Sequence, residues 1–99
     1  MIERLLRPLT ELSGVMSVHL VERDGFVVYS SGPPAGSDEI ERWQALVQSS
    51  TNDATTTLVM EHGYLILSPV APRTLAVKCD RSTNLGLARS TINEVRWPA

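Results

Sequence analysis

Two histidines and one cysteine are the residues of this chain that could act as a base or a nucleophile near neutral pH. His19 lies within a β-forming run, and His62 precedes Gly63 in an expected turn, where histidine tolerates a left-handed backbone better than most residues do. A catalytic histidine needs a positioned partner, and the sequence places none beside either one. Cys79 is interpreted as a small buried hydrophobic residue, the commoner role of a lone cysteine. We expect no catalytic residue.

Phosphate, metal and nucleic-acid sites are not indicated either. The segment 30–36, SSGPPAG, is glycine-rich, but Pro33 and Pro34 have no N–H to donate to a phosphate, so it is interpreted as a turn before a helix. No cysteine or histidine pair has the C-x-x-C or H-x-x-x-H spacing of metal ligands. The net charge of -2 argues against nucleic acid. We expect no cofactor and no metal.

Arginine is the remaining residue type with chemical potential. An arginine supplied to a GTPase by another protein can raise hydrolysis by a factor on the order of 10³–10⁵. Arg23, Arg73 and Arg81 fall in expected turns or loops, with freedom to reach a partner. Glu39 and Arg42 fall on an expected helix. These five residues are the candidates for binding a partner.

Length and composition bound the class of protein. The 99 residues make one domain, 1–99, with 42% hydrophobic and 20% charged residues, as in ordinary soluble domains. No apolar run is long enough to cross a bilayer, and the charged N-terminus does not resemble a signal peptide. A single cysteine fits a reducing compartment. We therefore expect a cytoplasmic protein without membrane insertion.

Three amphipathic helices are predicted, because apolar residues recur at a spacing of three or four in three stretches. The first opens the chain, is bent or shortened by Pro8 and ends at Gly14. The second is capped by Ser37 or Asp38. The third covers about residues 84–97, with a proline ending it.

Five strands are predicted between these helices. The residues 24–25, Asp-Gly, are the strongest short hairpin signal and are expected to form a two-residue loop that pairs Leu20 with Tyr29 and Val21 with Val28. A second hairpin is expected around His62-Gly63, and a fifth strand at TLAVKC after a turn bracketed by two prolines. The second hairpin places four apolar residues on one face: Leu58, Met60, Leu65 and Leu67. The order helix, two strands, helix, three strands, helix predicts a layered α+β domain.

The second helix and the third strand suggest a protein partner. Trp43 adds apolar surface to a domain that already has two helices to cover its sheet, and the residues 55–57, all threonine, begin an edge without the charge or proline that usually blocks pairing. An identical chain is the expected partner; the alternative is that Trp43 completes the core of the monomer. The expected dimer interface consists of Ile40, Trp43, Val47, Thr55, Thr57 and Val59.

The chain resembles the Roadblock/dynein light chain family along essentially its whole length. The resemblance lies in the order of elements and in Gly14-Val15 after the first helix, the residues 23–25 in the first hairpin turn, and the residues 84–89, NLGLAR, at the start of the last helix. It implies a five-stranded antiparallel sheet with the first and last helices on one face and the middle helix on the other. It also implies dimers that pair through the third strand and the middle helix.

The same resemblance implies a function. The resemblance implies that bacterial relatives are partners of Ras-like small GTPases. Some of these relatives stimulate GTP hydrolysis by rearranging the GTPase's own residues. The expectation is a non-catalytic homodimer that binds and regulates such a GTPase; the alternatives are a structural adaptor in a multiprotein complex and a small-molecule sensor. Gly86, which costs the last helix about 1 kcal/mol relative to alanine, is expected to allow close packing of that helix on the sheet; phosphate binding or no role are the alternatives.

Overall fold

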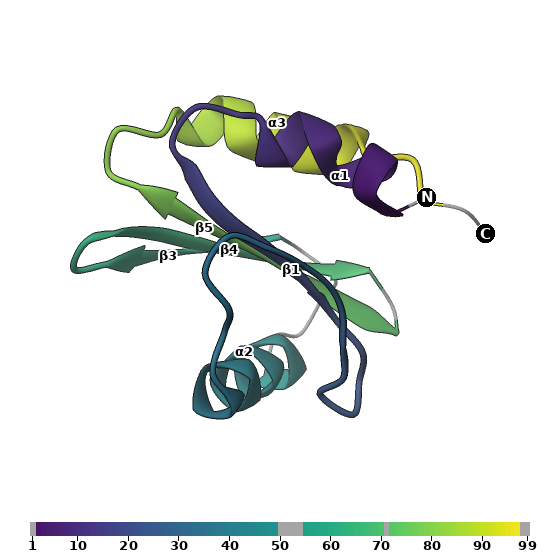
Figure 1. Ribbon diagram of the computed structural model, residues 1–99. Helices are drawn as coiled ribbons and strands as arrows, with labels where there is room; N and C mark the ends of the chain where they lie inside the picture. Colours follow the sequence, from purple (N-terminus) through teal and green to yellow (C-terminus); the bar gives the residue numbers. More distant parts are fainter. Residues whose placement is uncertain (1, 50–54, 71, 98–99) are drawn as a thin grey trace.

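The computed structural model describes residues 2–49, 55–70 and 72–97, which form an antiparallel sheet with helices on both faces (Figure 1). The strands lie in the order β2-β1-β5-β4-β3, so β2 and β3 are the two edges. This is the predicted α+β architecture with the predicted order of elements. In chain order the elements are α1 (Ile2–Thr10), β1 (Val15–Val21), β2 (Val27–Ser31), α2 (Ser37–Ser49), β3 (Thr56–Met60), β4 (Gly63–Val70), β5 (Arg73–Asp80) and α3 (Leu85–Glu94).

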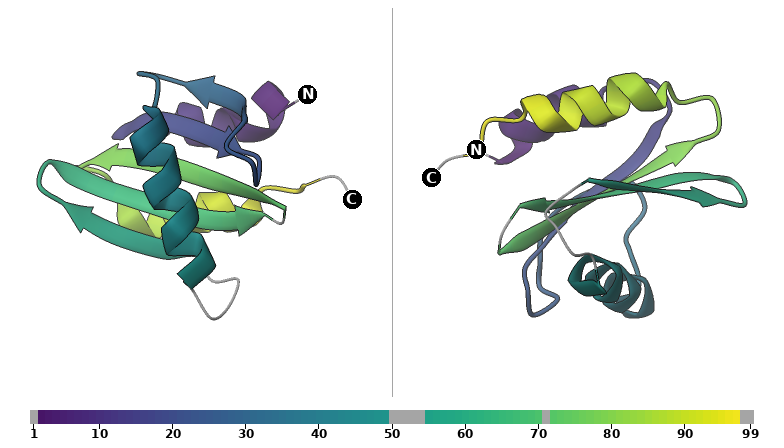
Figure 2. Two further views of the ribbon diagram at one scale, coloured as in Figure 1. Left: turned by 90° about the horizontal axis from the view of Figure 1, so that it is seen from below. Right: turned by 180° about the vertical axis from the view of Figure 1, so that it is seen from behind.

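The sheet separates two apolar clusters, because successive residues of a strand point to opposite faces. On one face α1 and α3 cover the larger cluster, and on the other α2 lies across the sheet by itself (Figure 2). The larger cluster consists of Leu6, Leu9, Val18, Leu20, Ile66, Leu75, Val77, Cys79, Ala88 and Ile92. The smaller cluster, beneath α2, consists of Val21, Ile40, Trp43, Leu65, Leu67 and Ala76.

The first hairpin has a longer loop than predicted. Leu20 pairs with Tyr29 as expected, but Val21 pairs with Val27, which leaves Val28 as an extra residue in the edge strand. The loop between Val21 and Val27 is a turn with a bulge: the Gly25 N–H donates to the Glu22 carbonyl (3.0 Å), and Gly25 has φ +94. A three-residue loop of this kind needs glycine in the left-handed position. Asp-Gly therefore marks the hairpin correctly but does not form its whole loop.

The second hairpin is shifted by two residues from the predicted register. Leu58 pairs with Leu65 and Met60 with Gly63, so the loop consists of Glu61 and His62. A shift of two keeps every side chain on its predicted face. Gly63 is not a left-handed turn residue but lies against β5, where an added Cβ would come within 2.0 Å of the Cys79 carbonyl oxygen. Close contact between two strand backbones is what this glycine permits.

The boundaries of all three helices differ from the predicted ones. Helix α1 ends at Thr10 and not at Gly14, which lies in the turn before β1. Gly36, not Ser37 or Asp38, caps α2: its carbonyl accepts from the Ile40 N–H (3.1 Å), and its own N–H donates to Glu39 Oε1 (3.3 Å). This is half of a capping box, with the acidic residue three positions into the helix. Helix α3 begins at the expected Asn84 cap but ends at Glu94, before the proline at 98, which lies outside the described residues.

The expected packing role of Gly86 is wrong. Gly86 is exposed on the outer side of α3, and a Cβ built there would meet just the Asn84 Oδ1 atom, at an ordinary contact distance of 3.5 Å. The glycine that fits closely beside α3 is Gly14, where a Cβ would lie 2.2 Å from Thr83 Oγ1. Helix α3 therefore has a glycine in its first turn, Gly86, that makes no close packing contact in the described structure.

Candidate functional site

The two edges of the sheet differ in how open they are to another strand. Edge β2 is interrupted by the extra residue Val28, and such bulges are one way in which proteins block edge pairing. Edge β3 pairs continuously with β4 from Thr56 to Met60 and carries neither charge nor proline. Val59 is 81% exposed and Met60 51% exposed on this strand. Among the described residues, β3 is the edge best suited to pair with a further strand.

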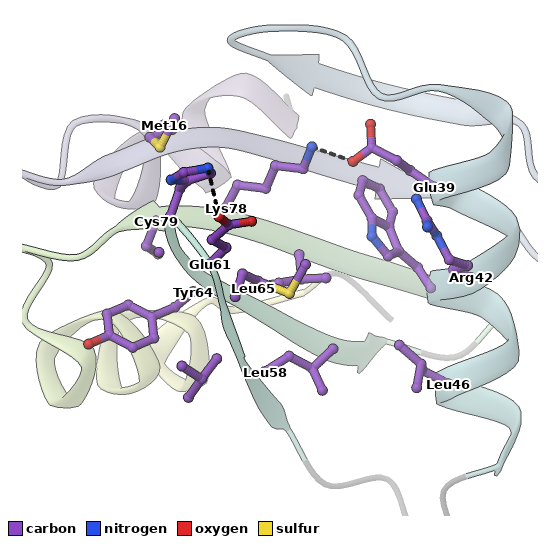
Figure 3. Close-up of a pocket in the computed structure, with 15 residues that line it drawn as sticks. Met16, Glu39, Arg42, Leu46, Leu58, Glu61, Tyr64, Leu65, Lys78 and Cys79 are labelled. Atoms are coloured by element: carbon purple, nitrogen blue, oxygen red, sulfur yellow. Dashed lines mark hydrogen bonds and ion pairs between the residues drawn. The ribbon is translucent and has the colours of Figure 1, made fainter.

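An apolar groove of about 560 Å³ lies beside this edge, between α2 and the β3–β4 hairpin (Figure 3). Leu46 on α2 and Leu58 on β3 line it from opposite sides, and Met16 of β1 lies at one end. Met60 lies on the same sheet face as Leu58 and adds a flexible apolar side chain. We call the surface formed by Met16, Leu46, Leu58, Val59 and Met60 the β3 surface.

Trp43 and Ile40 are not exposed on this surface. Trp43 is 4% exposed and packs with Ile40 in the cluster beneath α2, so the alternative that Trp43 completes the core of the monomer describes this chain. Val47 is half-buried against the same cluster. Ile40 and Trp43, which were predicted for the interface, therefore cover the sheet of their own chain, and the interface itself stays a prediction. Leu46, the neighbour of Val47, points into the groove and was not among the residues predicted for the interface.

The N-terminal half of α2 is held to the sheet by a polar group as well. Lys78 of β5 forms a hydrogen-bonded ion pair with Glu39, and the Lys78 Nζ lies 5.7 Å from the centre of the Trp43 ring. The hydrogen bond from Lys78 lowers the pKa of the Glu39 carboxyl below its ordinary value. Glu39, predicted to bind a partner, is thus already paired within the chain.

Two of the three loop arginines are also held within the chain, contrary to the freedom predicted for them. Arg73 is the first residue of β5 and forms an ion pair with Glu22 (Nε to Oε1, 2.7 Å). Arg81, which follows β5, donates to the Glu61 carbonyl in the loop of the second hairpin. Arg23 is exposed in the first hairpin loop, and the structure shows no side-chain partner for it among the described residues. Arg42 is exposed on α2 and lines the groove.

An arginine of the last helix, which was not among the candidate residues, supports the edge strand. Arg89 of α3 donates to Thr57 Oγ1 (2.5 Å) and to the Thr55 carbonyl (3.0 Å). It therefore connects α3 to the beginning of β3, and Thr55 and Thr57 are half-buried there. The sequence signal that could have found it is its spacing on the helix, four residues after Leu85 and three before Ile92, both of which pack in or against the larger cluster.

Cys79 and His62 both line the groove but differ in exposure. Cys79 is buried, and burial raises the pKa of its thiol above the ordinary value, whereas His62 is exposed in a loop. Within residues 2–49, 55–70 and 72–97, no group of three or more His, Cys, Asp or Glu side chains lies close enough to hold a metal ion. No helix in the same residues has the length and apolar character needed to span a membrane.

Comparison with known structures identifies the architecture. A Roadblock/LC7 domain from Streptomyces avermitilis superposes with a TM-score of 0.68 at 24% identity, over 96% of this chain and 94% of that one. The chain has the Roadblock/LC7 fold. MglC from Myxococcus xanthus shares this Roadblock/LC7 fold at 14% identity and a TM-score of 0.72, over 94% of this chain and 92% of that one. MglB from Myxococcus xanthus does so at 19% identity and a TM-score of 0.70, over 93% and 76% of the respective chains.

These likenesses confirm the fold that the resemblance predicted. No family profile and no curated protein matches the chain. One of the similar structures is described as MglB with a tetrameric arrangement. The geometry of this chain, with an unblocked edge strand next to an apolar groove, is suited to binding protein.

Proposed function

We propose that this chain is a non-catalytic cytoplasmic module that forms a homodimer through its β3 surface, and that the dimer binds and regulates a Ras-like small GTPase. The observation that supports the homodimer is that the open edge strand β3 lies beside exposed apolar side chains. The second part rests on the resemblance to the Roadblock family and on the fold shared with MglB and MglC.

The geometry of the dimer follows from two-fold symmetry. A two-fold axis perpendicular to the sheet makes the two β3 strands antiparallel and joins the two sheets into one. The same axis keeps both α2 helices on one face, so each helix covers the groove of the other chain. Leu46, Leu58 and Met60 would then be buried on that face, and Val59 on the face that carries α1 and α3. Ile40, Trp43 and Val47 position α2 from below.

Sedimentation tests the dimer directly. The unchanged protein at micromolar concentration is expected to contain two chains. Val59→Lys places a charge on the open edge and is expected to yield folded monomers, because lysine on an edge strand opposes strand addition. Phe26→Lys is the matched control: Phe26 is also an exposed apolar residue, but it lies in the hairpin at the other edge. A monomer of the unchanged protein, or equal effects of the two substitutions, would contradict the proposed interface.

Binding to purified Ras-like small GTPases tests the second part. The dimer is expected to bind a GTPase loaded with one nucleotide, GDP or a non-hydrolysable GTP analogue, more tightly than with the other. Val59→Lys should lose this binding if the GTPase contacts both chains. A stable dimer that binds none of the small GTPases of its organism would refute the regulatory role and leave the dimer standing. A dimer that connects other proteins would then be a structural adaptor.

Small-molecule sensing is a second candidate, favoured by the size of the groove. Its volume of about 560 Å³ lies within the roughly 300–1,000 Å³ that is typical of ligand pockets. In the proposed dimer this space is filled by the other chain, so the two candidates compete for one surface. A small molecule that binds the Val59→Lys monomer but not the dimer would show that the ligand and the second chain compete for this groove.

A further inference from the structure

His19 is a buried titratable group beneath α2 that the dimer does not use. It lies on β1, is 0% exposed and points to the sheet face that α2 covers. Its Nδ1 atom lies 2.7 Å from the Ser30 Oγ atom of β2. Its Nε2 atom is buried and has no hydrogen-bond partner among the described residues. One nitrogen of the ring is therefore satisfied and the other is not, whichever tautomer is present.

The surroundings of His19 are unsuited to a positive charge. From α2, the Trp43 ring packs on the imidazole with the ring centres 5.6 Å apart, and Glu39 is the carboxylate on that side. From β5, Lys78 places an ammonium over the same Trp43 ring and already pairs with Glu39. From β2, Ser30 offers a hydroxyl. An imidazolium would be a second cation beside Lys78, competing for one carboxylate.

These contacts lower the pKa of His19 below its ordinary value of about 6.5, mainly through burial, with Lys78 acting in the same direction and Glu39 opposing both. The sign of the linkage follows. A depressed folded pKa means that the unfolded chain takes up the proton first, so the stabilisation is fully present above about pH 6.5 and is lost as the pH falls toward the folded pKa. The arrangement in which α2 covers the sheet therefore favours neutral His19; we call this arrangement the closed form.

We propose that protonation of His19 releases α2 from the sheet, so that α2 is an acid-sensitive lid on the smaller core cluster. In the charged ring both nitrogens carry a proton, and in the closed form the Nε2 proton has no acceptor among the described residues; lifting α2 admits water to it. Helix α2 is the element free to respond, because it is the sole helix among the described residues on its face of the sheet. The release rests on the geometry of one chain; its effect on the dimer, through the loss of Leu46 from the β3 surface, rests on the proposed function.

Hydrogen exchange of backbone amides, corrected for the intrinsic effect of pH, tests the proposal. As the pH falls from about 7.5 to about 5.5, α2 amides of the unchanged protein are expected to exchange up to about tenfold faster, because a His19 released from the sheet takes up a proton with its ordinary pKa of about 6.5. The amides of β4 and β5 are expected to stay better protected than those of α2. His62→Gln, which alters a histidine whose side chain is 90% exposed, should behave identically. His19→Gln should lose the pH dependence. Equal pH dependence in His19→Gln and the unchanged protein would overturn the proposal.

A second measurement does not depend on the folding of His19→Gln. The two imidazoles of the unchanged protein are followed by NMR and assigned with His62→Gln. The proposal requires His19 to charge at the same pH at which the α2 amides lose protection; charging of His19 with α2 still protected would overturn it. Sedimentation at both pH values separates the two proposals. Acid release of α2 in a protein that is monomeric throughout would support the lid and contradict the dimer.

Discussion

Replacement of Gly86 by alanine is expected to stabilise the protein. Gly86 is the second residue of α3, in a helical conformation and exposed, and a Cβ built on it meets just the Asn84 Oδ1 atom at 3.5 Å. That oxygen accepts from the Leu87 N–H (3.0 Å) and caps the helix; an ordinary van der Waals contact leaves this bond in place. The change therefore removes the entropic cost of glycine without a steric cost.

The magnitude follows from helix propensity. Glycine costs roughly 0.5–1 kcal/mol relative to alanine inside a helix, so Gly86→Ala should raise the free energy of unfolding by about that amount. For a domain of this size, 1 kcal/mol corresponds to about 4–8 °C in Tm. Urea unfolding should show a higher midpoint at unchanged slope, because the surface exposed on unfolding does not change.

Gly63→Ala is the matched control for a glycine that is needed. Its Cβ would lie 2.0 Å from the Cys79 carbonyl oxygen, in the backbone of the neighbouring strand, and backbone shifts of this kind cost about 1–3 kcal/mol or more. Opposite signs for the two substitutions are expected. A Gly86→Ala protein destabilised as much as Gly63→Ala would refute the reasoning, since it would mean that α3 begins in close contact with another part of the chain.

Two further predictions concern the core and the mechanism. Trp43→Ala should lower the free energy of unfolding by about 3–5 kcal/mol, measured in urea, whereas Trp97→Ala should cost less because Trp97 is half-buried; equal costs would contradict the assignment of Trp43 to the core. Arg23→Ala should change single-turnover GTP hydrolysis by a bound GTPase less than about tenfold, because the resemblance implies that such domains act by repositioning the GTPase's own groups. A loss of about 10³-fold with binding intact would establish an arginine finger.

The sequence alone determined the order of the elements and the faces of the strands. Alternation of apolar residues fixed the faces, so the side chains of the second hairpin lie on the predicted side although its register moved by two residues. Asp24-Gly25 located the first hairpin, and Asn84 located the start of α3. These features are local, since each depends on residues that are neighbours in the sequence.

Tertiary structure decided everything that depends on what a residue meets from elsewhere in the chain. Helical spacing shows that Trp43 belongs to an apolar stripe, but not whether the sheet or a second chain covers it; the sheet does. A glycine in the sequence does not show whether a backbone lies above it, which separates Gly86 from Gly63. The position of His19 beneath α2, beside Lys78, arises from β1 and β5 pairing across more than half the chain. Contacts between residues so far apart in the sequence are determined by how the elements pack, and the local sequence pattern does not predict them.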